Sequence, residues 1–378
     1  MIILFKMRKN FLPFFAIFVA MAVVITSCGE SDEPIAPEKI VVEQNYVPYR
    51  TEKYLRIGYM LKTWEFLKEG LTLQRIIIVD NNTKADLYTI EKESLPIIHK
   101  DPLGEGFDKI DRYYLSIQLP IPLTQAVPLS ISHRFILRDT IQNKDVSVEG
   151  GTFQPRYDES PHVIAAPVKG DYYLVHNQST MDYHFWIAFF IGGSIYTNEK
   201  FAFDLIQMDE TWTQTFSGDP QVNESYFAYG DTLYSVASGT VLKAVDGLPE
   251  NAGDSHDIPL NTLDASAGNH LLIDIGGGCY AVYMHCMPGS LLVNAGDVVT
   301  EGQPLAQLGN SGNSTEPHLH FHLVDRPELW YCDGLPFVFK NYTKTGEIVF
   351  NPNPAVTPIA PIIGVNANLE NWSITSFE

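Results

Sequence analysis

The sequence predicts an all-β fold in two parts. Short runs rich in β-branched and aromatic residues, such as Tyr54–Met60 and Leu73–Val79, alternate with turn residues such as Asp80–Thr83. No helical period of apolar residues is evident beyond Gly170. The chain has 378 residues, of which 45% are hydrophobic and 19% charged, so it can bury a full core in each of two domains.

Residues 1–27 have the pattern of a targeting segment rather than of a folded element. Basic residues precede an almost wholly apolar run, Phe11–Val24, and small residues then lead to Cys28. This order resembles the signal peptide of bacterial lipoproteins and predicts cleavage before Cys28 and lipidation of its thiol. An ordinary signal peptide and an uncleaved anchor helix remain alternatives, although the run is short for a spanning helix. We expect a cell-envelope protein that is lipid-anchored to the outer membrane, either periplasmic or surface-exposed.

The first folded part should follow an acidic, proline-containing linker at residues 28–45. Short candidate strands continue through residues 46–158, including Leu129–Phe135, and we predict an immunoglobulin-like β-sandwich there. Its histidines, His99 and His133, are isolated in the sequence. We therefore expect a spacer or a binding module rather than a catalyst.

The second folded part should span residues 160–340, after a boundary marked by proline and glycine. Its candidate strands include Phe201–Ile206 and a hairpin from Leu271 to His285 around a turn of three glycines. Residues 341–378 are rich in proline, and we expect them to form an irregular tail.

Three histidines at two-residue spacing stand out in the stretch Gly309–Leu323. Since alternate residues of a strand share a face, His318, His320 and His322 should line one face while apolar neighbours pack behind them. Imidazoles gathered on one rigid face suit a metal site or proton transfer. The alternative is a polar strand face on which the histidines have no shared role.

Several motifs extend this pattern in a fixed order. Gly239–Val241 is followed by Asn269–Asp274, Tyr283–His285, Asn294–Gln303 and Gly309–Phe321. As an ordered set, they resemble the lysostaphin-type zinc endopeptidases, a murein-cleaving family, over roughly residues 165–325. The resemblance implies an antiparallel β-barrel or sandwich metallopeptidase core, Zn²⁺ as the cofactor and peptidoglycan peptides as the substrate.

The resemblance also implies roles for single residues. His320 and Asp204 correspond to zinc ligands of the family, and His285 and His318 correspond to its catalytic histidines. A zinc ion held by three protein ligands keeps one position for water and lowers the pKa of that water to roughly 7. Histidines beside the metal can take a proton or stabilise a developing oxyanion.

One position departs from the family pattern. Lys200 stands four residues before Asp204, where the family has a histidine ligand, and a lysine ammonium has no lone pair for a metal. His184 is our first candidate for a replacement ligand, and His322 is the second because it shares the face of His320. Weak zinc binding with fewer protein ligands is another possibility. Lys200 could also form an ion pair with Asp204 and hold the carboxylate away from a metal.

The sequence thus supports two main hypotheses for the function. The first is a zinc-dependent metalloendopeptidase of the cell envelope that hydrolyses peptidoglycan peptide bonds. The alternative is an inactive relative that binds peptidoglycan or activates a partner hydrolase. A surface adhesin built on the first domain has less support. The net charge of −20 argues against nucleic acid as a partner, since phosphate binding needs a basic face.

Overall fold

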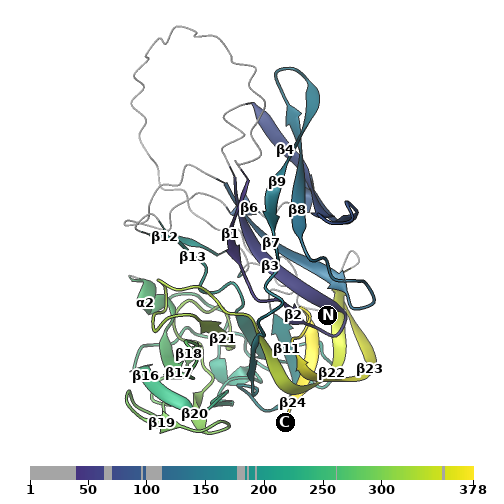
Figure 1. The fold of residues 1–378 in the computed structure, drawn as a ribbon. Helices are drawn as coiled ribbons and strands as arrows, with labels where there is room; N and C mark the ends of the chain where they lie inside the picture. Colours follow the sequence, from purple (N-terminus) through teal and green to yellow (C-terminus); the bar gives the residue numbers. More distant parts are fainter. Residues whose placement is uncertain are drawn as a thin grey trace.

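The structure is a computed structural model of the chain, shown as a ribbon in Figure 1. It describes residues 40–63, 70–94, 97–98, 113–176, 184, 187–191, 194–260, 262–350 and 354–378. Nearly all regular structure in these ranges is β, which confirms the predicted all-β class. The predicted signal peptide and Cys28 lie outside the described residues. No helix within the ranges above is long and apolar enough to cross a membrane.

The N-terminal part consists of two β-sheets packed face to face. The first sheet contains β1 (Val41–Asn45), β2 (Tyr49–Arg50), β3 (Tyr54–Thr63), β6 (Ile97–Ile98) and β7 (Tyr113–Pro122). The second contains β4 (Leu71–Asp80), β5 (Asp86–Glu91), β8 (Ile131–Asp139) and β9 (Lys144–Phe153). A short 3₁₀ turn, η3, covers Lys92–Ser94. Alternate residues of both sheets, such as Leu61 and Phe135, share one core cluster, as expected of a sandwich. The immunoglobulin-like assignment stays a prediction.

The C-terminal part is organised by one large sheet, in which eleven strands are described. Their order is β10 (His162–Ile164), β22 (Phe337–Phe350), β24 (Ser373–Phe377), β11 (Gly170–His176), β14 (Phe203–Gln207), β21 (Leu319–Val324), β18 (Tyr280–Cys286), β17 (Asn269–Asp274), β16 (Gly239–Val245) and β19 (Val298–Val299), with β23 (Pro354–Ala367) paired to β22. Smaller pairs are β12 (Phe189–Ile191) with β13 (Ser194–Tyr196), and β15 (Thr232–Tyr234) with β20 (Pro304–Gln307). The short helical turns are η4 (Asn223–Ser225) and α2 (Leu263–Ser266). Side chains from β11, β14, β18 and β21 meet in the main core cluster.

The prediction of an irregular tail at residues 341–378 is wrong. β22 and β23 form a long hairpin, and β24 returns to pair with β11 inside the large sheet (Figure 1). Among the described strands, β23 pairs only with β22, so its other edge is open and a proline that faces this edge removes no ladder hydrogen bond. Pro361 lies where the register of this hairpin shifts. The predicted domain boundaries themselves stay predictions.

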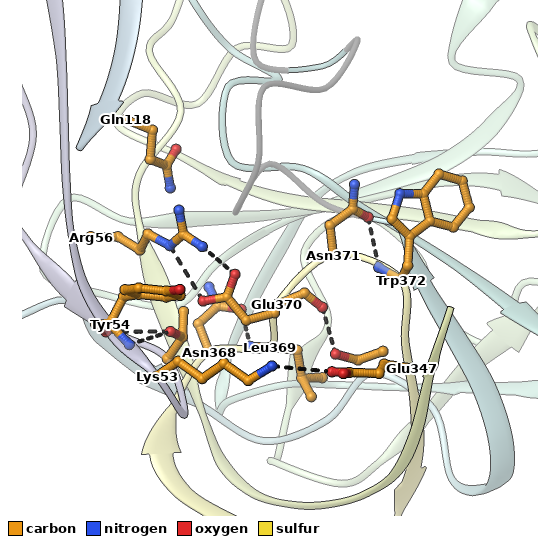
Figure 2. A network of polar contacts seen from close by, with 12 residues as sticks. Lys53, Tyr54, Arg56, Gln118, Glu347, Asn368, Leu369, Glu370, Asn371 and Trp372 are labelled. Carbon is orange, nitrogen blue, oxygen red and sulfur yellow. Dashed lines mark hydrogen bonds and ion pairs between the residues drawn. The ribbon is translucent and has the colours of Figure 1, made fainter. Parts of the chain in front are cut away.

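The two parts are joined by polar contacts between β3 and the turn before β24. Figure 2 shows the Arg56 guanidinium bonded to both carboxylate oxygens of Glu370, and Lys53 paired with Glu347 at 3.3 Å. The side chains of Arg56 and Glu370 are only 6% and 12% exposed. The sandwich is therefore packed onto the C-terminal sheet through a buried ion pair.

A second contact joins the sandwich to the segment that precedes β14. The ring of Phe201 lies edge-on to Tyr46 and Tyr49, at centroid distances of 5.0 and 6.0 Å. The hydroxyls of Tyr46 and Thr197 share a hydrogen bond of 2.7 Å. The sandwich thus holds the chain just before Asp204, which places it next to the candidate site.

Candidate metal centre

The site begins as a row of polar side chains across three neighbouring strands. His176 of β11 is paired with Asp204 of β14, and Asp204 is paired in turn with His320 of β21. Residues directly opposite in adjacent strands lie on the same face of a sheet. The register alone therefore gathers two histidines and one carboxylate on one face.

Strand β21 shows the alternation that the sequence predicts. Leu319 and Phe321 are fully buried in the main core cluster, while His320 and His322 lie on the other face. His320 Nε2 and His322 Nδ1 are 3.1 Å apart, so the two rings share a hydrogen bond. His322 is fully buried, and its Nε2 has no hydrogen-bond partner among the described residues. His322 is therefore a direct neighbour of His320.

His285 reaches the site through an unusual backbone conformation. Its φ of 65° lies in the left-handed region, which non-glycine residues seldom adopt and in which histidine is enriched. Strand β18 alternates normally up to this point, with Tyr283 in the main core cluster and Met284 on the opposite face. The turn at His285 breaks the alternation, and its ring lies 4.8 Å from that of His318. Such local strain clusters at functional sites, where the surrounding structure holds it in place.

Two backbone carbonyls set the tautomers of His285 and His318. His285 Nδ1 lies 2.7 Å from the carbonyl oxygen of Ser311, and His318 Nδ1 lies 2.8 Å from that of Glu316. A carbonyl only accepts, so each Nδ1 carries the proton and donates it. Burial lowers the pKa of both imidazoles, and for His285 the neighbouring His318 adds to the effect. Both rings are therefore neutral near pH 7, with an Nε2 lone pair available.

Asp204 is surrounded by histidines. Its carboxylate oxygens lie 2.9 Å from His320 Nδ1, 3.4 Å from His184 Nε2, and 3.6 Å from both His176 Nδ1 and His318 Nε2. Burial alone would raise the pKa of Asp204, but His184 and the other histidines hold it well below its ordinary value. Burial alone would lower the pKa of His320, and its hydrogen bond with Asp204 raises it instead. Asp204 is therefore an anionic centre with histidines on several sides.

Lys200 does not form the ion pair with Asp204 that the sequence left open. Its ammonium bonds to Ser116 Oγ of β7 and lies 5.2 Å from the centroid of the Tyr46 ring. The side chain is fully buried, and burial lowers its pKa to about 7. Lys200 therefore faces the sandwich, and the side chains close to the Asp204 carboxylate are the histidines described above.

The structure gathers all the predicted site residues that it describes. Asp204, His184, His285, His318 and His320 lie together, whereas Cys28 is outside the described ranges. Sequence reasoning missed His176 and Glu199. His176 ends the strand that pairs with β14, so extending that strand by one residue would have found it. Glu199 is adjacent to Lys200, and burial raises its pKa while His320 opposes this effect.

The donor atoms fit a metal ion. Three sets each bring their ligand atoms within 4.8 Å of one another: His285, His318 and His320; His176, His184 and Asp204; and His184, Glu199 and His320. Imidazole nitrogens and carboxylate oxygens are the donors of catalytic zinc sites. The buried, unpartnered Nε2 of His322 borders the same cluster. The chemistry of the donor set is therefore suited to zinc.

Comparison with known protein families finds a match in the second half of the chain. Residues 225–328 match the model of Peptidase family M23. This segment is therefore similar to a Peptidase family M23 domain. The match includes His285, His318 and His320, and it begins after Asp204 in the sequence. The predicted resemblance to the lysostaphin-type endopeptidases is thereby confirmed.

Two relatives are similar to part of this chain. It is 28% identical over 130 residues to the peptidoglycan DD-endopeptidase ShyA of Vibrio cholerae, a match that covers 33% of this chain and 28% of ShyA. It is 35% identical over 96 residues to an uncharacterized metalloprotease of Haemophilus influenzae, which covers 25% of this chain and 18% of that protein. The chain thus spans less than a third of the length of either relative.

Solved structures show a more distant likeness. The catalytic domain of lysostaphin from Staphylococcus simulans is 22% identical, with 32% of this chain and 85% of that chain covered and a TM-score of 0.20. A zinc-containing peptidase from Vibrio cholerae is 13% identical, with 75% and 82% covered and a TM-score of 0.21.

Proposed function

We propose that this protein is a zinc-dependent metalloendopeptidase of the cell envelope that hydrolyses peptide bonds of peptidoglycan. The observation that carries the proposal is the cluster of Asp204 and its surrounding histidines beside an M23 domain. The similarity to a peptidoglycan DD-endopeptidase supports the choice of substrate.

Asp204, His320 and His184 would hold the metal. His320 Nδ1 lies 2.9 Å from one carboxylate oxygen of Asp204, and His184 Nε2 lies 3.4 Å from the other. A bound zinc ion supplies Lewis acidity toward a peptide carbonyl and makes water more acidic. The burial of these residues keeps bulk water away, which strengthens electrostatic interactions in the site.

His285 and His318 are the proposed catalytic histidines. Each is anchored through Nδ1 to a backbone carbonyl, so each presents an unprotonated Nε2. A neutral imidazole in this state can take a proton from water and later donate it to the leaving amine. When protonated, the same nitrogen can donate a hydrogen bond to a developing oxyanion.

The cell-envelope location rests on the N-terminal sequence. A lipid on Cys28 and the acidic linker at residues 28–45 would tether the folded parts to the outer membrane. A tethered hydrolase would meet peptidoglycan within the reach of its linker.

The test is release of cleaved peptides from purified peptidoglycan, measured by liquid chromatography and mass spectrometry. We expect zinc-loaded protein to release them, chelation to stop the release and added zinc to restore it. Asp204→Asn should abolish the release. The matched variant Asp257→Asn should not, because Asp257 is exposed. No release by fully zinc-loaded wild type would contradict the proposal and favour an inactive relative that binds peptidoglycan.

A further inference from the structure

The turn before β14 presents two adjacent side chains to different surroundings. Backbone hydrogen bonds from Lys200 N to Thr197 O (3.1 Å) and from Ala202 N to Glu199 O (2.9 Å) close this turn. Lys200 bonds to Ser116 of the sandwich, whereas Glu199 faces His320 and His184. Glu199 therefore faces the site, whereas Lys200, at the position that the sequence pattern marks as a ligand, does not.

We propose that Glu199 is a metal ligand of this protein and, with His184 and His320, supplies the donor that is missing at Lys200. One ligand atom from each of these three residues lies within 4.8 Å of the other two. The inference rests on the proposed function, since it concerns the same metal centre.

A cation bound beside the Glu199 carboxylate would stabilise it. No side chain in the described ranges donates a hydrogen bond to it or pairs with it as a salt bridge. A carboxylate that is partly removed from water without such donors is costly, and a bound metal ion removes that cost. Asp204, by contrast, is already held by His320 Nδ1 at 2.9 Å.

The sandwich fixes which way the turn faces. Phe201 is held between Tyr46 and Tyr49, and Thr197 shares a hydrogen bond of 2.7 Å with the Tyr46 hydroxyl. These contacts secure both ends of the turn, so rotation of Lys200 into the site would break the packing on the sandwich. Glu199 is held toward the histidines for the same reason.

The donor atoms of the proposed ligands are of the types that zinc binds. Glu199 supplies a carboxylate, and His184 and His320 supply two imidazoles, with one ligand atom of each within 4.8 Å of the other two. Zinc binds both donor types and accepts four or five ligands, so this set leaves room for a water or a substrate. The Asp204 carboxylate, 3.4 Å from His184 Nε2 and 2.9 Å from His320 Nδ1, adds a second negative charge near a divalent ion, which suits a buried site.

The experiment measures metal binding by the purified full-length protein. Zinc affinity is obtained by competition with a chromophoric chelator, and the coordination is read from the visible absorption of the Co²⁺-substituted protein. We expect Glu199→Gln to weaken zinc binding more than tenfold and to change the Co²⁺ spectrum. Glu199→His should retain zinc, because it restores a donor, but with a shifted Co²⁺ spectrum.

A matched control is Glu301→Gln, since Glu301 is exposed and its carboxylate pairs with Lys340. It should bind zinc as the wild type does. Circular dichroism of each variant establishes that it is folded, and the retained binding of Glu199→His separates loss of a ligand from loss of the fold. Wild-type affinity and an unchanged Co²⁺ spectrum in Glu199→Gln would overturn the inference while leaving the proposed function standing. No zinc binding by the wild type would overturn both.

Discussion

The buried ion pair between Arg56 and Glu370 should be a main support of the contact between the two parts of the chain. The Arg56 guanidinium makes two hydrogen bonds to the carboxylate, and the side chains are 6% and 12% exposed (Figure 2). Arg56→Met would leave the Glu370 carboxylate buried without its partner. Removing one partner of a buried pair costs about 3–5 kcal/mol in the free energy of unfolding.

Urea unfolding followed by tryptophan fluorescence measures this loss. The double variant Arg56→Met with Glu370→Gln should lose less than the sum of the single variants, by about 0.5–3 kcal/mol, because neither charge is then left alone. The control is Arg138→Met. Arg138 pairs with Asp145 at 3.0 Å, but their side chains are 38% and 64% exposed. Exposed pairs contribute about 0–1 kcal/mol. The reasoning is refuted if Arg56→Met costs no more than this control.

Three further predictions follow from single residues. Lys200→His should not tighten zinc binding in chelator competition, because the side chain at position 200 faces Ser116. Loss of the hydrogen bond to Ser116 should lower the free energy of unfolding in urea by about 1–3 kcal/mol. Tighter zinc binding by this variant would contradict the reasoning. His184→Ala should lower zinc occupancy, measured by elemental analysis, much more than His322→Ala, and equal occupancy of wild type and His184→Ala would remove His184 from the ligands. His133 is buried with its pKa lowered to about 4, so the unfolded chain binds more protons between pH 4 and 6.5; stability should therefore fall by up to about 3 kcal/mol as the pH drops through that window. His133→Asn should flatten this slope in urea unfolding at a series of pH values, and an unchanged slope would assign it to other groups.

Strand periodicity and ordered motifs predicted the fold class and the family. The period of two in residues 318–323 predicts a histidine face, and Leu319 and Phe321 do pack into the core behind it. His285 could be placed near His318 from the motif but not from alternation, because its left-handed backbone interrupts the strand pattern. The alternation of side chains in a strand therefore does not predict the position of a residue with a left-handed backbone.

The less predictable features depend on contacts between distant segments. The orientation of Glu199 and Lys200 is set by Ser116, which lies 84 residues from Lys200 in the sequence. Extending the first strand reaches His176, but its place opposite Asp204 depends on the register between β11 and β14. The prolines after residue 341 suggested an irregular tail, yet an edge strand accommodates them. Sequence spacing therefore predicted which histidines gather, while the orientation of one turn determines whether Glu199 or Lys200 faces them.

Metal analysis of purified protein lacking residues 1–28 tests the central claim most directly. The account predicts close to one zinc ion per chain, because imidazole nitrogens and carboxylate oxygens gather around Asp204 and His320 without Lys200. Asp204→Asn should carry much less zinc under the same loading conditions. A wild-type protein without zinc, under conditions that fully load a control zinc enzyme, would contradict the account.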